Sequence, residues 1–285
     1  MRLQVAKALS WGLVLIGAQA SPALGVGFAE SQADRVRLFN DDYYDVAFRK
    51  ADGRILYLYD KTTNQEVSPG NVFGPWVVRF SDGSWLDGAN FSPSNANRRF
   101  TYVWDNQAQI LTFHYEANGY QACDVTIAIQ PSDGPEFDAT LTIDNRSGMT
   151  VELLAFPVQL SFRRNQIEGV YVPMMEGMKL LPSFFDTYEF DSRYPGQMFS
   201  DFAFTELTVG SFAVFMVHDP QAQLLPAFWK LLRDDGYAGG VHKYHHDYDV
   251  EVATGQQQTF PTAVISIGSS LAEAMDSYWS RNQHD

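Results

Sequence analysis

Cysteine is nearly absent from this 285-residue sequence, in which Cys123 is the single example. One thiol excludes an intramolecular disulfide, and with it a scaffold of small disulfide-linked loops. Cys123 lies in an alternating segment, residues 122–127, where a small buried side chain is expected. A nucleophilic thiol would need a nearby base and some exposure.

Basic residues are also scarce. The sequence has 20 Lys and Arg against 34 Asp and Glu, a net charge of -14. Binding to a nucleic-acid backbone requires clustered cations, so we expect no nucleic-acid partner. An acidic surface of this kind keeps an exported protein soluble.

The sequence lacks an apolar run of the roughly 20 residues that a membrane-spanning helix needs. The apolar residues 8–18 follow Arg2 and Lys7 and precede a small-x-small motif that ends at Ala20. This pattern predicts a signal peptide over residues 1–20, with an uncleaved anchor as the alternative. Cleavage would leave 265 residues with a net charge of -16 and no membrane span, in a secreted or periplasmic location.

The sequence is rich in hydrophobic (45%) and aromatic (14%) residues, enough to bury a large core. Its most regular stretch is residues 38–67. Apolar side chains alternate over residues 44–48, Gly53 provides a turn, and residues 55–59 return as a second strand. The polar residues 60–64 then end the strand by bonding to their own backbone. This stretch predicts a β-hairpin.

Further strands are predicted every 8 to 15 residues, with no amphipathic helix between them. This spacing predicts an all-β fold, a large antiparallel sandwich over residues 35–268, preceded by a flexible leader over residues 21–34. Residues 226–232 fit either a strand or a short helix. The clearest alternating segments are residues 100–104, 110–114, 123–129, 137–143, 202–207, 211–217, 241–252 and 260–267.

A short helix is predicted at the C-terminal end, over residues 269–285. Ser269 or Ser270 can cap it, and Glu273 stands three residues after Ser270, the spacing of a capping box.

Three stretches resemble the galactose mutarotase-like β-supersandwich, as found in the N-terminal domain of bacterial glycoside hydrolases. The first is the hairpin, with its Asn40-Asp41 pair and its Leu-Tyr-Asp-Lys-x-Thr ending. The second is residues 141–148 followed by residues 151–162. The third is the passage from Tyr171-x-Pro173 to Tyr194-Pro195-Gly196. The resemblance implies a carbohydrate-associated module without its catalytic barrel, in which residues 269–285 would begin a linker to the missing barrel.

Aromatic side chains in or beside loops are the candidate carbohydrate contacts. Pyranose rings pack their C–H faces on Trp and Tyr rings, while amides and carboxylates bond the hydroxyls. The candidates are Trp76, Trp85, Tyr171, Glu176, Tyr194 and Gln197. Two glycosylation sequons, at Asn90 and Asn145, are no more than chance provides in a chain of this length.

No catalytic pair stands out. Glycoside hydrolysis requires two carboxyl groups roughly 5 to 10 Å apart. Glu176, Asp186, Glu189 and Asp191 lie in the aromatic segment 171–194, but solvated loop carboxylates are the favoured interpretation. The chain resembles part of a glycoside hydrolase but has no recognisable catalytic domain.

Histidines raise two further hypotheses. On a strand, His242 and His246 would lie about 13 Å apart at about 3.3 Å per residue. Two ligands of one zinc each lie about 2 Å from it, so we expect no metal or other cofactor. An epimerase would need a His acid and a Glu base in one cleft, and His114, His218 or His242 with Glu206 are available.

Three functions therefore remain open. The first is an exported, carbohydrate-associated module, non-catalytic or incomplete alone, whose partner is carbohydrate or a catalytic glycosidase domain. The second is a small sugar-active enzyme of the epimerase type. The third is a structural domain of the cell envelope.

Overall fold

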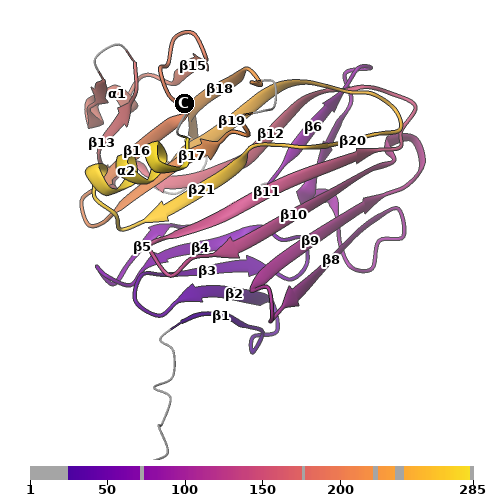
Figure 1. The fold of residues 1–285 in the computed structure, drawn as a ribbon, viewed down its shortest axis with the longest axis horizontal. Helices are drawn as coiled ribbons and strands as arrows, with labels where there is room; N and C mark the ends of the chain where they lie inside the picture. Colours follow the sequence, from indigo (N-terminus) through magenta and orange to yellow (C-terminus); the bar gives the residue numbers. More distant parts are fainter. Residues whose placement is uncertain (1–24, 71–73, 175–176, 221–223, 235–240, 283–285) are drawn as a thin grey trace, which may run out of the picture.

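The computed structural model describes residues 25–70, 74–174, 177–220, 224–234 and 241–282. The predicted signal peptide and Glu176 lie outside these residues. Within them the fold is all-β, with three antiparallel sheets, a single-turn helix and one longer C-terminal helix (Figure 1). No helix in the described part of the chain is both long and apolar enough to cross a membrane.

The first sheet contains the N-terminal strands in chain order. Its strands are β1 (Val26–Ala29), β2 (Arg35–Asn40), β3 (Tyr44–Arg49), β4 (Ile55–Asp60) and β5 (Gln65–Ser68). The prediction of a flexible leader over residues 21–34 is wrong for residues 26–29, because they form β1 and pair with β2. Gly27 of β1 lies against the ring of Phe39, a close approach that leaves no space for a side chain.

The predicted hairpin is confirmed as β3 and β4. Gly53 takes a φ of 72°, and its backbone lies under the hydroxyl of Tyr115, which donates a 2.9 Å hydrogen bond to the Asp52 carbonyl. After β4, the buried Asp60 carboxylate accepts hydrogen bonds from the Thr62 amide, at 2.8 Å, and from the Thr63 hydroxyl, also at 2.8 Å. The polar ending therefore bonds locally, as the sequence predicted.

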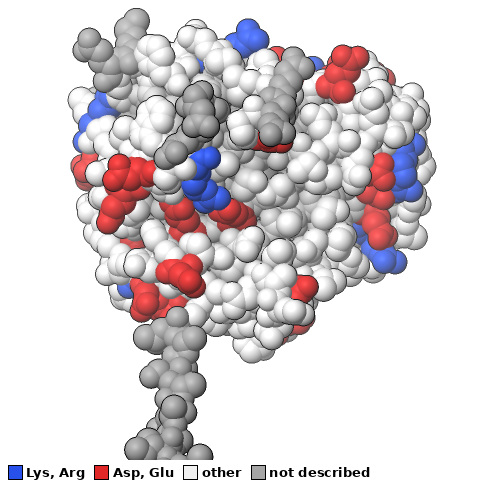
Figure 2. All heavy atoms as spheres, in the orientation of Figure 1, with Lys and Arg blue, Asp and Glu red and all other residues white. Residues whose placement is uncertain are grey.

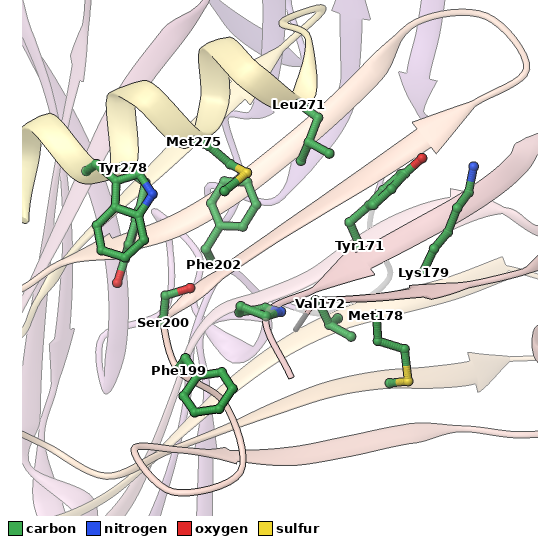
Figure 3. A pocket seen from close by; sticks show the side chains of 13 residues that line it. Tyr171, Val172, Met178, Lys179, Phe199, Ser200, Phe202, Leu271, Met275 and Tyr278 are labelled. Atoms are coloured by element: carbon green, nitrogen blue, oxygen red, sulfur yellow. The ribbon is translucent and has the colours of Figure 1, made fainter. Parts of the chain in front are cut away.

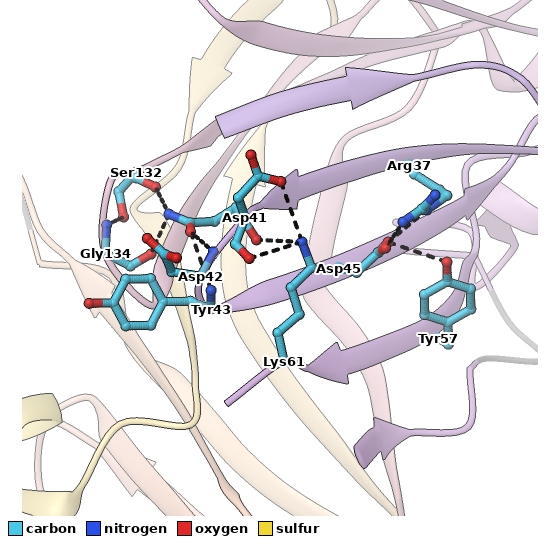
Figure 4. Close-up of polar contacts among 10 residues, drawn as sticks. Arg37, Asp41, Asp42, Tyr43, Asp45, Tyr57, Lys61, Ser132 and Gly134 are labelled. Carbon is cyan, nitrogen blue, oxygen red and sulfur yellow. Dashed lines mark hydrogen bonds and ion pairs between the residues drawn. The ribbon is translucent and has the colours of Figure 1, made fainter. Parts of the chain in front are cut away.

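Residues of the resemblance motif also join the first sheet to the second (Figure 4). The side-chain nitrogen of Asn40 donates to the carbonyls of Ser132, at 3.0 Å, and Gly134, at 3.3 Å. Lys61 Nζ donates to the Asn40 carbonyl at 2.8 Å. Because the Ser132–Gly134 turn connects β10 and β11, these bonds fix the hairpin against the larger sheet.

The second sheet is the largest. In spatial order it contains β14 (Met178–Leu180), β13 (Ile167–Val172), β16 (Phe202–Leu207), β17 (Ser211–Val217), β21 (Thr262–Ile267), β11 (Glu136–Asn145), β10 (Cys123–Pro131), β9 (Ile110–Ala117) and β8 (Arg98–Asp105), with β20 (Gln256–Thr259) also pairing with β11. The third sheet contains β15 (Phe190–Tyr194), β18 (Ala227–Asp234), β19 (Val241–Val252), β12 (Val151–Arg163), β6 (Val77–Phe80) and β7 (Trp85–Asp87). Of residues 226–232, which fitted either a strand or a helix, residues 227–232 form part of strand β18.

The core lies between these sheets. Phe48 of the first sheet contacts Phe113 of the second, with ring centroids 5.2 Å apart. Phe162 of the third sheet contacts Phe212 of the second, at 4.8 Å. Apolar burial between sheets is the main stabilising term of such a sandwich.

Asn145 holds the second and third sheets together. Its side-chain nitrogen donates to the carbonyls of Met149, at 2.7 Å, and Val252, at 2.8 Å. Its side-chain oxygen accepts from the amide of Ser147, at 3.1 Å. Asn145 is fully buried, so this sequon is not accessible in the folded chain.

The single-turn helix is α1 (Pro182–Phe185), and the C-terminal helix is α2 (Leu271–Arg281), which packs across β16 and β17 (Figure 1). The predicted capping box is present. The Ser270 hydroxyl accepts from the Glu273 amide at 3.2 Å, and the Glu273 carboxylate accepts from the Ser270 amide at 2.8 Å.

Replacing Ser270 with alanine should lower the free energy of unfolding by about 1 kcal/mol, because the Glu273 amide loses its acceptor. Chemical denaturation of the two proteins measures the difference. Ser280→Ala, at the other end of α2, is the control, since the Ser280 hydroxyl donates to the carbonyl of Ser277, within the same helix, and caps no amide of the first turn. Equal losses in both variants would contradict the role of the cap.

Candidate functional site

A buried carboxylate lies where β16, β17 and β18 meet. Asp201 directly precedes β16, and His218 directly follows its hairpin partner β17, so the pairing of these strands brings the two together. His218 Nε2 lies 2.9 Å from Asp201 Oδ2, and Trp229 Nε1 of β18 donates to Asp201 Oδ1 at 2.7 Å. Asp201 has no exposed surface. Its two oxygens therefore orient an imidazole and an indole.

A second imidazole completes this cluster. His246 of β19 places Nε2 3.2 Å from Asp201 Oδ1, and its ring stacks on Tyr248 with centroids 4.7 Å apart. Burial lowers the pKa of His246 below its ordinary value of 6.5, although the charge of Asp201 opposes the shift. His246 is therefore neutral at pH 7.

This shift predicts a pH dependence of stability. Below pH 6.5 the unfolded chain binds a proton at His246 that the folded chain does not bind. The free energy of unfolding should therefore fall with pH from 6.5 toward the lowered pKa, by up to about 1.4 kcal/mol per pH unit. Denaturant titrations between pH 7 and pH 5 measure the slope. In His246→Phe the contribution of His246 to this pH dependence should be lost. An unchanged slope in that variant would show that His246 is not its source.

His218 and Arg281 contribute to the wall of a groove of about 1030 Å³, which we call the central groove. Its lining combines hydroxyl, amide, imidazole and guanidinium groups with aromatic and aliphatic surfaces. The lining residues are Thr140, Tyr194, Val217, His218, Asp219, Pro220, Leu224, Leu225, Gln258, Thr259, Phe260, Pro261, Thr262 and Arg281.

The groove is held by contacts between distant elements. The hydroxyls of Thr140 and Thr262 are hydrogen-bonded at 2.7 Å. Arg281, at the end of α2, donates from Nη1 to Asp138 Oδ1 of β11 at 2.9 Å. The ring of Tyr194 lies 5.7 Å from that of His218. The site therefore offers hydrogen-bonding groups beside an aromatic ring.

A second cavity, of about 470 Å³, is mostly apolar (Figure 3). Leu271 and Met275 project into it from α2, and Tyr171 lines it from β13. Its one cation, within the described residues, is Lys179, whose Nζ lies 2.7 Å from Glu206 Oε2. That contact lowers the pKa of Glu206, so the carboxylate is ionised and paired. We call this the apolar pocket.

The predicted carbohydrate contacts do not form one site. The prediction of Trp76 as a carbohydrate contact is wrong: its ring is fully buried, with its centroid 5.3 Å from that of Tyr115, because the chain folds back over it at Gly88. Trp85 is 53% exposed on β7.

The other candidates are also dispersed. Tyr171 lines the apolar pocket and Tyr194 the central groove. Gln197 is exposed, but its side-chain oxygen accepts from the Arg193 amide at 3.0 Å. Carbohydrate binding by these side chains stays a prediction.

The residues proposed for catalysis are also dispersed. Asp186, Glu189 and Asp191 are exposed, and Glu189 accepts from the Arg233 amide. Glu206 faces Lys179 in the apolar pocket, whereas His218 faces the central groove. Asp201 and Arg281 were missed, since neither stands in a recognisable motif.

Figure 2 shows acidic side chains outnumbering basic ones on the face that carries α2, in keeping with the net charge of -14. The one Arg of the central groove is itself paired with Asp138 and lies 3.5 Å from Glu136. The groove is therefore unsuited to polyanions and better suited to neutral polar ligands.

No protein-family model and no curated protein matches this sequence. Solved structures do match its fold. An alpha-N-acetylgalactosaminidase from Bifidobacterium bifidum superposes with a TM-score of 0.58 and 8% identity, over 84% of this chain. The chain spans only 37% of that enzyme.

Smaller proteins match over their whole length. A galactose mutarotase-like protein from Lactobacillus casei gives a TM-score of 0.54 at 8% identity, covering 85% of this chain and 100% of its own. A galactose 1-epimerase from Lactobacillus acidophilus gives 0.53 at 8% identity, covering 86% and 99%. With three antiparallel sheets and these neighbours, the chain has the galactose mutarotase-like β-supersandwich fold, which carbohydrate-active enzymes share.

Proposed function

We propose that this chain is an exported carbohydrate-associated module that binds a neutral sugar in the central groove and is non-catalytic or incomplete alone. The observation that carries the proposal is the composition of the groove. Tyr194, which is 8% exposed, presents the accessible part of its ring to the groove, and hydroxyl and amide groups of Thr140, Gln258 and Thr259 surround a space of about 1030 Å³. Sugars are recognised by this combination of ring stacking and hydroxyl bonds.

The fold comparison supports the same class of ligand. The Bifidobacterium bifidum neighbour is described as a complex with GalNAc, and another neighbour is a galactose 1-epimerase. Galactose and N-acetylgalactosamine are therefore the first probes. A few hydrogen bonds and one ring contact suggest a Kd on the order of millimolar, about -4 kcal/mol.

Replacing Gln258 with alanine should weaken sugar binding about fivefold, because one hydrogen bond to a hydroxyl contributes about 1 kcal/mol. Titration calorimetry or ligand-observed NMR with both sugars measures the change. Gln257→Ala is the matched control: Gln257 is the preceding residue of β20, is exposed and does not line the groove. Equal sugar binding by the native chain, Gln258→Ala and Gln257→Ala would contradict sugar binding in the central groove.

One observation favours a second function, a small sugar-active enzyme of the epimerase type. Asp201 bonds His218 Nε2 and so orients the imidazole at the groove wall. An oriented imidazole is a candidate proton donor or acceptor. Polarimetry of freshly dissolved α-galactose tests it. If the native chain accelerates mutarotation and His218→Asn does not, the enzyme hypothesis replaces the non-catalytic proposal. If the native chain does not accelerate mutarotation, the non-catalytic proposal is supported.

A further inference from the structure

Two exposed aromatic rings lie outside the central groove. Trp85 is 53% exposed on β7, the edge strand of the third sheet. Tyr120 is 70% exposed in the 3₁₀ turn Gly119–Gln121, which connects β9 and β10 of the second sheet. Neither ring lines the central groove or the apolar pocket.

Hydrogen bonds join the two segments that carry these rings. The Tyr120 hydroxyl donates to Asp82 Oδ2 at 2.8 Å, in the turn that connects β6 and β7. Gln121 Nε2 donates to the Trp85 carbonyl at 3.2 Å and lies 3.0 Å from the Ser84 hydroxyl. These three bonds join the turn that carries Tyr120, between β9 and β10, to the β6–β7 hairpin that carries Trp85, at the edge of the third sheet.

The groups around both rings are polar. The Arg79 guanidinium lies 5.8 Å from the Trp85 ring centroid, and Arg98 donates to Gln121 Oε1 at 2.9 Å. Hydrogen bonds from Ser84, and then from Tyr120, lower the pKa of Asp82. A docking surface for an apolar protein partner would have aliphatic neighbours, as the apolar pocket has in Leu271 and Met275. Here the rings stand among hydrogen-bonding groups.

We propose that Trp85 and Tyr120 form an open platform that binds internal pyranose units of a polysaccharide. Each ring can pack on the C–H face of a sugar, and Asp82, Arg79 and Gln121 can bond hydroxyls beside it. An open surface has no wall to end a chain, so it accepts a polymer where the central groove accepts a short sugar. The platform shares no residue with the groove and does not rest on the function proposed for it.

Trp85 was predicted from the sequence as a carbohydrate contact, whereas Tyr120 was not. These residues are 35 positions apart, and bonds to Asp82 and from Gln121 join the segments that carry them. A second, independent site would raise the affinity of the chain for polymers through multivalency.

Affinity gel electrophoresis of the full chain tests the platform. The gels contain galactomannan, arabinogalactan, xylan, mixed-linkage β-glucan, pullulan or dextran. At least one polymer should retard the native protein. Trp85→Ala and Tyr120→Ala should each weaken that retardation about fivefold to tenfold, since one ring contact is lost.

Three control variants test whether the platform, another exposed ring or the central groove causes the retardation. Trp279→Ala removes a ring of similar exposure, 54%, from the apolar pocket and should leave retardation unchanged. Tyr120→Phe keeps the ring but loses the bond to Asp82, so an intermediate effect is expected. Gln258→Ala should leave the platform's contribution intact while it weakens binding of short sugars. Thermal unfolding verifies that each variant is folded.

The proposal is overturned if none of the six polymers retards the native protein. It is equally overturned if Trp85→Ala and Tyr120→Ala migrate as the native protein does, or if Trp279→Ala has the same effect as they have. Loss of retardation in Gln258→Ala alone would support the groove and reject the platform.

Discussion

Replacing Asp201 with alanine is expected to lower the free energy of unfolding by about 3–5 kcal/mol, or to prevent folding. The carboxylate is fully buried and holds Trp229 Nε1 at 2.7 Å and His218 Nε2 at 2.9 Å. Without it, an indole N–H and an imidazole nitrogen lose their partner, and each unsatisfied group costs about 1–3 kcal/mol. Urea titration followed by tryptophan fluorescence measures the loss.

Asp201→Asn is the informative companion variant. Its side-chain oxygen can still accept from Trp229, but its amide nitrogen replaces the second acceptor beside His218. A loss smaller than that of the alanine variant is expected. If Asp201→Ala unfolds at the same denaturant concentration as the native chain, the buried cluster is not a stabilising feature of the fold.

The second large effect is expected at Asn145, where alanine should cost about 3 kcal/mol. The carbonyls of Met149 and Val252 lose a donor and the Ser147 amide loses an acceptor, all in a buried position. These bonds join β11 to the third sheet, so cooperativity as well as stability should suffer. Denaturant titration, with attention to the slope, measures both.

Asn90→Ala is the matched control for Asn145→Ala. Asn90 heads the other glycosylation sequon but is exposed, so its loss should change the free energy of unfolding by less than about 0.5 kcal/mol. Similar losses in the two variants would contradict the buried network. Peptide mass spectrometry of protein secreted from a glycosylating host should detect no glycan on Asn145.

The sequence predicted those parts of the fold whose signal is local. The hairpin of β3 and β4 has period-two alternation with Gly53 between its strands, and the cap of α2 lies within four residues. Strand β1 was assigned to a flexible leader because its four residues are ordered by pairing with β2, which local composition does not record.

The candidate site could not be predicted in the same way. Thr140, His218, Gln258 and Arg281 come from four separate parts of the chain. The strand order of the second sheet brings the first three together, and the bond from Arg281 to Asp138 of β11 adds the fourth. Trp76, in contrast, was predicted to be a site residue but is not one. Its Gly-Pro neighbourhood resembles a loop, yet the ring is buried against Tyr115, 39 positions further along. Long-range packing decided both outcomes.

The fold itself does not decide between binding and catalysis, because one architecture can carry unrelated functions. Asp201 bonds to Nε2 of His218 and orients its imidazole, while Glu206 is paired with Lys179, which lines the apolar pocket. Within the described residues, Glu206 and His218 therefore do not lie in one cleft as a His and Glu pair.

The most direct test of sugar binding in the central groove is an NMR titration of the isotopically labelled chain with galactose and N-acetylgalactosamine. The amides of Thr140, Gln258 and Thr259 and the ring protons of Tyr194 should shift progressively and saturate in the millimolar range, while the amide of Gln257 shifts less. Shifts confined to the apolar pocket around Met275, or no shifts with either sugar, would contradict the proposed site.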